Sequence, residues 1–151
     1  MVESFVKDGT RLTEETLRDL HRPLTQGILR DESGFYRRVP VYIRGSLHVP
    51  PNWIKVPDAM QRFVDQYGDR PATEHPVRWA ARAHIDMAGI HPFIDGNGRT
   101  SRLLVNWLLM REGWPPALYT SGDRHEYLTA LEDAQFMLHR YLTMAQQVKE
   151  G

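Results

Sequence analysis

Leucine and isoleucine recur every three or four residues near the start of the chain, which is the spacing of one face of an α-helix. They stand at Leu17, Leu20, Leu24 and Ile28. Thr13 precedes this stripe and is followed directly by two acidic residues, so Thr13 suits the N-cap of the helix. Pro23 falls inside the pattern, and we expect it to kink or interrupt the helix there.

Two further helices are predicted from their boundaries and their apolar faces. The first covers about residues 57–67, with Pro57 at its first position and Gly68 just after its end. The second covers about residues 76–90, and small or apolar residues share one of its faces. That face holds Val77, Ala80, Ala81, His84, Ile85 and Ala88. On such a face we interpret His84 as a hydrogen-bonded core histidine.

The most apolar helix is predicted over about residues 98–112. Its narrow polar stripe holds Arg99, Arg102 and Asn106. A helix that is apolar around most of its circumference belongs at the centre of a bundle. Two more helices are predicted at about 123–132 and 134–149. We therefore expect one all-α domain over residues 1–151.

Residues 35–45 alternate between apolar and polar positions, which is the period of a β-strand. One face holds Val39, Val41 and Ile43, and the other holds Pro40, Tyr42 and Arg44. Pro40 has no N–H group to give to a sheet, so the strand should lie at an edge. We expect a short, exposed β-hairpin over about residues 34–51.

Composition excludes several classes of function. The 151 residues carry nineteen basic and nineteen acidic side chains, so no basic field favours nucleic acid or an anionic membrane as a partner. Cysteine is absent, which excludes a disulfide framework and a thiolate nucleophile. The charged first fifteen residues indicate no signal peptide, and no stretch approaches the roughly 20 apolar residues of a membrane span. We expect a cytoplasmic domain.

Residues 91–102 read HPFIDGNGRTSR and carry the chemistry of the chain. Their chemically distinctive members are His91, Asp95, Gly96, Asn97, Gly98, Arg99 and Arg102. A glycine-rich turn that opens a helix presents backbone N–H groups to an anion, and two arginines one turn apart can reach one polyphosphate. A single carboxylate suits Mg²⁺, which shares its other positions with phosphates and water. A histidine has a pKa close to that of a general base at neutral pH.

This segment matches the signature HPFx[DE]GNGRxxR at every fixed position, and on that motif the chain resembles the Fic (Fido) family. The resemblance covers roughly residues 13–135, with residues 34–51 as the family's flap. It implies a Fic-type helical bundle with a short β-hairpin flap. It also implies a protein adenylyltransferase, which transfers AMP from ATP to a Ser, Thr or Tyr hydroxyl of a target protein and releases pyrophosphate.

The resemblance assigns a role to each motif residue. His91 would take the proton of the target hydroxyl, and Asp95 would hold Mg²⁺. The turn Gly96–Asn97–Gly98 would bind phosphate through its backbone, together with Arg99 and Arg102. Phe93 would anchor the loop in the core, and Tyr127 would lie near the adenine base. The flap would hold an extended target segment along Val39, Pro40, Val41, Tyr42, Ile43 and Arg44.

Two other functions stay open on the same motif. The site could remove AMP from a modified protein by hydrolysis, or the domain could bind a nucleotide or a partner without catalysis. Intact His91 and Asp95 disfavour the binding-only alternative. Relatives that phosphorylate carry Lys in place of Gly98, and relatives that transfer phosphocholine carry Ala in place of Gly96, so AMP transfer is favoured over both.

Many members of the family are restrained by an inhibitory helix, [S/T]xxxE[G/N], whose Glu pairs with the second motif arginine. Thr10 and Glu14 have its spacing, but Glu15 stands where Gly or Asn is required. Glu150 is followed by Gly151, but Gln146 stands where Ser or Thr is required. Neither segment matches the inhibitory pattern, which leaves three explanations. A separate, antitoxin-like inhibitory protein supplies the Glu, the inhibitory part lies outside this sequence, or the enzyme is unrestrained.

Overall fold

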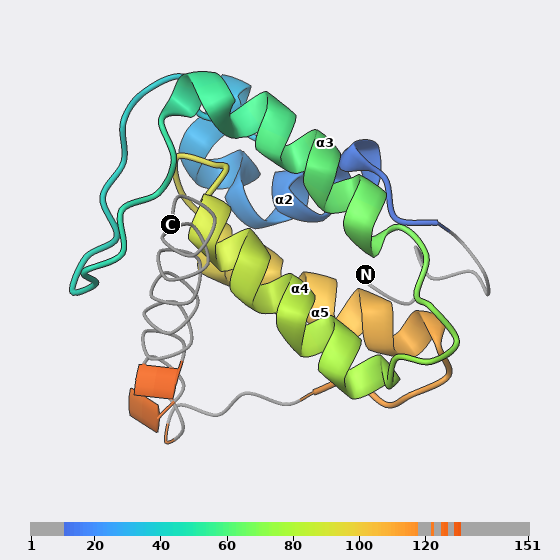
Figure 1. Cartoon of the computed structure of the whole chain (residues 1–151). Helices are drawn as coiled ribbons and strands as arrows, with labels where there is room; N and C mark the ends of the chain where they lie inside the picture. The colour runs from blue at the N-terminus through green and yellow to red at the C-terminus, as the bar shows by residue number, and fades with distance from the viewer. Residues whose placement is uncertain (1–10, 118–121, 123–124, 127–128, 131–151) are drawn as a thin grey trace, which may run out of the picture. The chain divides into compact units, whose positions relative to one another are not determined.

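The computed structural model describes residues 11–117 together with residues 122, 125–126 and 129–130. Its elements, in chain order, are α2 (Glu14–Leu29), η1 (Arg30–Glu32), η2 (Trp53–Lys55), α3 (Val56–Tyr67), α4 (Pro76–Ile90) and α5 (Asn97–Arg111). The described residues contain helices and no strand, which confirms the all-α fold class (Figure 1).

The chain divides into two compact units. The first comprises Met1–Val41 and Pro50–Ala117 and contains all the elements named above. The second comprises Tyr42–Val49 and Leu118–Gly151. Residues 125–126 and 129–130 are helical, in keeping with the helix predicted at 123–132. The rest of that prediction, and all of the helix at 134–149, lies outside the described residues.

Helix α2 begins where the sequence predicts. The side-chain oxygen of Thr13 accepts a hydrogen bond of 3.1 Å from the backbone N–H of Thr16, which satisfies one of the unpaired donors of the first turn. The helix continues past Pro23, so the expected interruption does not occur. Both halves of the helix, before and after the proline, have buried side chains. These belong to Leu17, Leu20, His21 and Thr25. Ile28 is 61% exposed, because the last turn extends beyond the core.

Helix α4 has the predicted bounds but buries a different face. Its buried residues are Trp79, Ala80, Ala83, His84 and Met87, whereas Val77 and Ala81 are exposed. The predicted face therefore lies rotated from the real one. Burying the large side chains of Trp79 and Met87 removes more apolar area from water than burying Val77 and Ala81 would.

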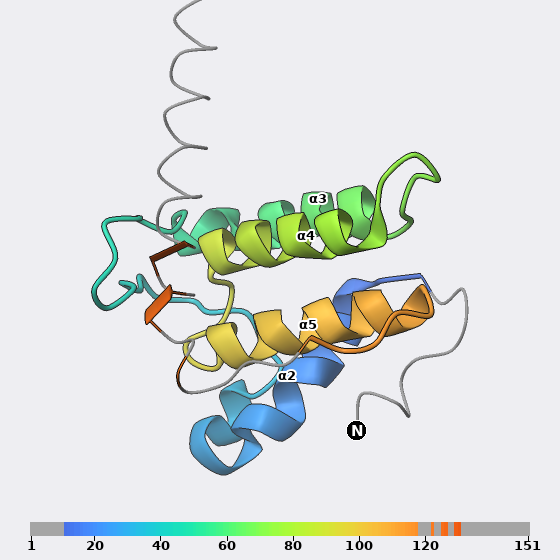
Figure 2. The ribbon, with the colours of Figure 1, turned by 90° about the horizontal axis from the view of Figure 1, so that it is seen from below.

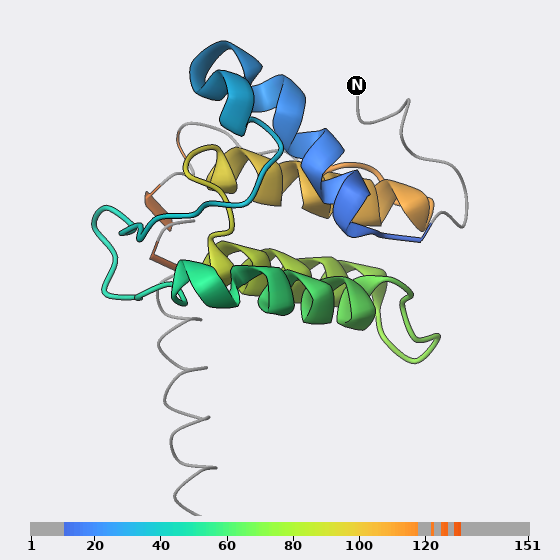
Figure 3. The same ribbon diagram turned by 90° about the horizontal axis from the view of Figure 1, so that it is seen from above.

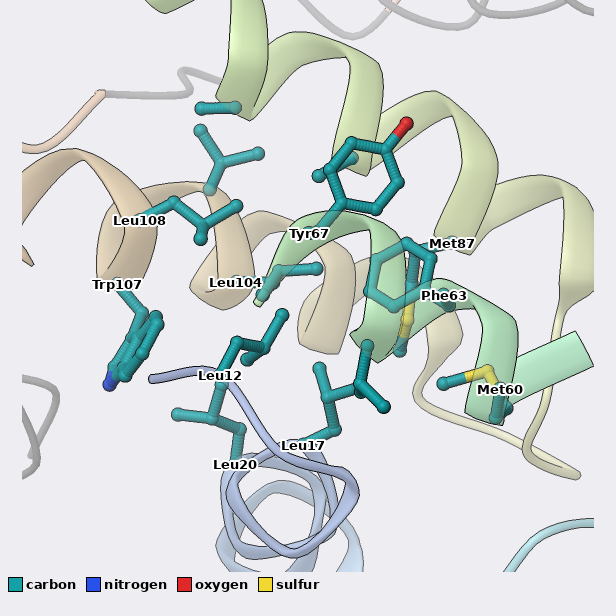
Figure 4. Close-up of a cluster of buried hydrophobic side chains, with 14 of the residues drawn as sticks. Leu12, Leu17, Leu20, Met60, Phe63, Tyr67, Met87, Leu104, Trp107 and Leu108 are labelled. Carbon is teal, nitrogen blue, oxygen red and sulfur yellow. The ribbon is translucent and has the colours of Figure 1, made fainter. Parts of the chain in front are cut away.

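The four helices form two layers. In Figure 2, α3 and α4 lie side by side in one layer, with α2 and α5 in the other, and Figure 3 shows the same arrangement from the opposite side. The core lies between the layers (Figure 4) and includes Leu12, Leu17, Leu20, Met60, Phe63, Tyr67, Met87, Leu104, Trp107 and Leu108. Helix α5 buries side chains on several sides and packs against both α4 and α2, although it lies in one of the two layers and not at their centre.

The expected hairpin at residues 34–51 is not formed: no residue of this segment has strand structure. It is a loop, with a turn closed by a 3.1 Å hydrogen bond from Ser46 N–H to the carbonyl of Ile43 and with Gly45 at φ +78°. Three prolines, Pro40, Pro50 and Pro51, remove N–H donors from a ladder. A lone two-stranded ribbon is marginally stable at best, so this loss of donors is decisive.

Among the described helices, none combines the length and the apolarity needed to cross a bilayer.

Stability should fall in mild acid because of His84. Burial lowers the pKa of His84, although a hydrogen bond with the backbone of Ser101 acts in the opposite direction. The folded protein therefore keeps the ring neutral where the unfolded chain, with a pKa near 6.5, already binds a proton. This contribution is complete above about pH 6.5 and is lost as the pH falls below that value.

We expect urea unfolding to give a lower free energy at pH 5.5 than at pH 7.5. His84→Gln, which cannot titrate, should reduce that difference, with the remainder coming from His21, whose pKa burial also lowers. An undiminished pH dependence in His84→Gln would contradict this assignment.

Candidate functional site

The turn between α4 and α5 brings together every predicted residue of the motif. These residues surround one cavity of about 250 Å³, lined by His91, Ile94, Asp95, Gly96, Asn97, Gly98, Arg99 and Arg102. Helix α4 ends at the histidine, and α5 begins at the asparagine. A proton acceptor, a carboxylate, a helix N-terminus and two guanidinium groups therefore face the same space.

His91 is held in an uncommon backbone conformation. It is the C-cap of α4, with φ 52° and ψ 60°, and its N–H donates to the carbonyl of Met87 at 3.1 Å. Few residues other than glycine adopt this left-handed geometry, so surrounding contacts must maintain it. One of these contacts is made by the His91 carbonyl, which accepts a 2.7 Å hydrogen bond from Nε of Arg37.

Arg37 is the positioning residue that sequence reasoning missed. It is only 2% exposed, and among its described partners every acceptor is a carbonyl oxygen. These carbonyls belong to Val39 at 3.2 Å, Pro51 at 2.6 Å, Ile90 at 3.4 Å and His91 at 2.7 Å. Its own N–H donates to the carbonyl of Pro92 at 2.9 Å. Burial lowers the pKa of Arg37, while the negative end of α4 favours its charge.

Figure 3 shows the chain after η1 running past the turn between α4 and α5, where Arg37 makes these contacts. The arginine therefore links both ends of the loop at residues 38–51 to the end of the helix that presents His91. Nothing in the local pattern distinguishes Arg37 from its exposed neighbour Arg38, because its partners lie up to 54 positions away.

Asn97 holds the turn through its side chain. Its Oδ1 accepts from the Phe93 N–H at 2.9 Å, and its Nδ2 donates to the Phe93 carbonyl at 2.8 Å. Asn97 can therefore offer an anion only its backbone N–H. Phe93 is fully buried, which confirms its predicted place as an anchor in the core.

His21 supports the turn from α2 and was also missed. Gly34 N–H donates to its Nδ1 at 2.9 Å, so the proton of the neutral ring lies on Nε2, which donates to the Asp95 carbonyl at 2.8 Å. The ring also stacks on Phe93, with centroids 3.7 Å apart. Burial lowers the pKa of His21, in keeping with a neutral ring. The one available signal is that His21 follows Leu17 by four positions on the apolar stripe.

Asp95 and the two arginines are the accessible part of the site. Asp95 Oδ1 accepts from the Gly96 N–H at 2.7 Å and lies 3.9 Å from Nη2 of Arg99. The side chains of Asp95 and Arg99 are 55% and 40% exposed. Arg99 also donates to the carbonyl of Leu24 at 3.2 Å. A Cβ at Gly98 would lie 3.4 Å from Nη1 of Arg102, so the glycine leaves room for this guanidinium beside the start of α5.

The remaining predicted residues are placed as follows. Val39, Pro40 and Val41 belong to the first unit, and Tyr42, Ile43 and Arg44 belong to the second. Val39 is 46% and Tyr42 85% exposed. Tyr127 lies outside the described residues, as does Glu150. The Oε1 atom of Glu14 accepts a 2.7 Å hydrogen bond from the Tyr36 hydroxyl.

Gly96 should tolerate no side chain. Its φ is +80°, and a Cβ would lie 2.6 Å from Cγ2 of Thr25. We expect Gly96→Ala to lower the free energy of unfolding in urea by more than Gly113→Ala, by at least about 1 kcal/mol. Gly113 is the matched control, since its φ is +78° and nothing lies within 4 Å of an added Cβ. Thr25→Ser removes the clashing methyl and should restore part of the loss. Equal costs for the two glycines would contradict the steric argument.

Loss of the Arg37 guanidinium should destabilise the protein. Arg37→Met leaves buried carbonyls without a donor, so we expect the free energy of unfolding to fall by at least about 2 kcal/mol. Arg38→Met is the control: this neighbour is exposed, and its replacement should change stability by no more than about 0.5 kcal/mol. Thermal and urea unfolding of both variants measure the difference. Similar small effects would show that Arg37 does not stabilise the connection between the loop and the end of α4.

Comparison with known proteins places this site in a family. The Fic/DOC family model matches residues 11–109. Protein adenylyltransferase Fic of Culex quinquefasciatus is 42% identical over 132 residues, which cover 87% of this chain and 26% of that protein. The protein of the same name from Drosophila willistoni is 44% identical over 117 residues, which cover 77% of this chain and 23% of that protein. The chain thus spans about a quarter of the length of these curated relatives.

Solved structures agree with the sequence comparison. Fic-1 from C. elegans superposes with a TM-score of 0.70 at 32% identity, covering 83% of this chain and 36% of that one. A Fic domain containing signaling protein from Bacteroides thetaiotaomicron gives a TM-score of 0.72 at 35% identity, covering 80% of this chain and 47% of that one. The motif, the helical bundle and the family model lead to one conclusion: the chain belongs to the Fic/DOC family.

Proposed function

We propose that this chain is a protein adenylyltransferase domain, which transfers AMP from ATP to a Ser, Thr or Tyr hydroxyl of a target protein. The observation that carries the proposal is the single cavity shared by His91, Asp95, the start of α5 and both motif arginines. The curated relatives are named protein adenylyltransferases, which supports the same activity.

The cavity suits the phosphates of a nucleotide. The first N–H groups of α5 have no carbonyl partner within the helix, and they carry the positive end of its dipole. Arg99 and Arg102 add two guanidinium groups on the same side of the helix start. A volume of about 250 Å³ is below the range of pockets that enclose whole drug-sized ligands, so the nucleoside would extend beyond the cavity.

His91 is the proposed proton acceptor. The target hydroxyl oxygen attacks the α-phosphorus as its proton passes to the imidazole, and the bond from that phosphorus to the bridging oxygen of the β-phosphate breaks. Pyrophosphate leaves and a phosphodiester joins AMP to the target. The buried link from Arg37 to the His91 carbonyl holds the backbone of this residue in place, so the backbone needs no rearrangement when substrate binds.

Asp95 is the proposed ligand of Mg²⁺. Its side chain is 55% exposed, and its Oδ2 has no hydrogen-bond partner among the described residues. The described residues contain no group of three or more His, Asp or Glu side chains that could hold a metal. One carboxylate with phosphate oxygens and water suits Mg²⁺, which would neutralise charge on the phosphates when bound.

The target is proposed to lie along Val39, Pro40, Val41, Tyr42, Ile43 and Arg44. No residue from 34 to 51 takes part in a strand, so an extended target segment could pair with this backbone. Tyr127 near the base, a separate inhibitory protein and a cytoplasmic location are further proposals. The lack of cysteine is in keeping with the last of these.

The proposal predicts that protein becomes labelled from ATP that carries radioactive α-phosphate and not from ATP that carries radioactive γ-phosphate. His91→Asn should reduce labelling by about 10²- to 10⁴-fold, because it removes the general base. Asparagine is preferred to alanine here, since it tolerates the left-handed backbone of residue 91. Self-labelling of the chain, resolved on a denaturing gel, provides the measurement without a known target.

His75→Asn is the matched control. His75 is the N-cap at the other end of α4, where its Nδ1 accepts from the Val77 N–H at 3.2 Å, and asparagine can also cap. Labelling of this variant should equal that of the wild type. Labelling from the γ position alone would mean phosphorylation instead. No labelling from either position, with release of AMP from an AMP-modified protein, would mean hydrolytic removal.

A further inference from the structure

A second, larger hollow lies beside the phosphate cavity in the same unit of the chain. Its volume is about 640 Å³, and its walls come from Arg18 in the first half of α2, from η1, from residues 35–39, and from η2 with the start of α3. Ile94 lines both hollows. This residue stands between the anchor Phe93 and the carboxylate of Asp95, so the two hollows share one wall residue of the motif turn.

The walls of the larger hollow are mainly apolar. Phe35 is 52% exposed, Val39 46% and Ile54 67%, and all three line it together with Trp53 and Pro57. Exposed apolar residues are unremarkable when they are scattered singly, but several around one concave surface mark a binding site. The hollow is the place in this unit where such side chains meet around a cavity next to the proposed reaction site.

The walls are held by internal contacts, so the hollow is formed before anything binds. Phe35 N–H donates to the carbonyl of Glu32 at 3.1 Å, and the Arg18 guanidinium lies 4.9 Å from the Phe35 ring centroid. Arg18 Nε also donates to the carbonyl of Gly34 at 2.7 Å. On the opposite wall, Ile54 N–H donates to the side chain of Asn52 at 3.0 Å.

We propose that this hollow binds a large apolar side chain, aromatic or aliphatic, of the target segment that presents the modified hydroxyl. The proposal rests on the proposed function and names the substrate class. Ile94 lines the cavity together with His91 and is also a wall of the hollow, so one residue of the motif turn belongs to both. Val39, another wall, belongs to the residues proposed to hold the target.

The charged residues of the hollow favour no net charge in the occupant. Arg18, Arg37 and Arg38 on one hand, and Asp31 and Glu32 on the other, line it, and the guanidinium of Arg37 is already engaged by backbone carbonyls. Selection therefore depends on the apolar walls. Burial of one large apolar side chain should raise the affinity for a peptide by about ten- to hundred-fold over a peptide with asparagine at that position.

The test uses the full chain and a set of synthetic peptides. Each peptide has a central threonine as its single hydroxyl side chain, in a glycine and asparagine background, with a single phenylalanine moved through the four positions on either side. Labelling from ATP carrying radioactive α-phosphate gives kcat/KM for each peptide. Quenching of tryptophan fluorescence, to which Trp53 in the wall contributes, gives peptide affinity without catalysis.

We expect phenylalanine to raise both kcat/KM and affinity at least ten-fold at one position or at two adjacent ones. Ile54→Glu, which places a charge in the hollow, should abolish this preference, so that peptides with and without phenylalanine give equal kcat/KM. Ile54→Ala should reduce the preference partially. Val77→Glu is the matched control, because Val77 is 45% exposed on α4 and lines neither hollow.

The two proposals fail in distinguishable ways. If peptides are labelled but phenylalanine helps at no position, or helps equally in Ile54→Glu, the hollow is not a target site and the transferase activity stands. If no peptide is labelled and the chain does not label itself, the proposed function fails. In that case the affinity measurement still tests whether the hollow binds an apolar side chain. Peptide binding that favours phenylalanine and is lost in Ile54→Glu would support this second proposal.

Discussion

The arrangement of the site depends on one buried guanidinium. Arg37 lies where α4 ends, and its charge is balanced by carbonyl oxygens that concentrate at the negative end of the helix. A planar group with five donors can serve several carbonyls at once, which a lysine ammonium cannot do with the same geometry. The left-handed conformation of His91 and the path of the chain at Val39 and Pro51 are therefore fixed by the same side chain.

Two further contacts hold the turn from other sides. Asn97 closes it on the backbone of Phe93, and His21 joins it to α2 through the Asp95 carbonyl. The ring of Phe93 stacks on His21, so the polar and apolar anchors form one unit. Because these contacts form when the chain folds, the order of the loop is already present before a nucleotide arrives.

Local sequence pattern was sufficient for the parts of this structure that depend on neighbours in sequence. It predicted the bounds of α4, the cap of α2 at Thr13 and the residues that line the cavity at the motif turn. It failed where distant residues decide. His21 lies 74 positions from its partner Asp95, and Arg37 lies 54 from His91, so no local pattern could reveal the contact that either residue makes. The hairpin prediction was wrong for a different, local reason: alternation records side-chain faces, whereas Pro40, Pro50 and Pro51 lack the backbone donors that a ladder needs.

The division between buried and exposed polar groups explains how the same loop can be rigid and still bind. Asn97, His21 and Arg37 have their polar atoms engaged inside the protein, whereas Asp95 and Arg99 interact with each other at 3.9 Å across a partly exposed surface. An ion pair of this length and exposure contributes little to stability. A phosphate or a cation can therefore replace it at small cost, while the buried contacts stay intact. The groups proposed to meet phosphate and Mg²⁺ are thus the ones that the fold does not need.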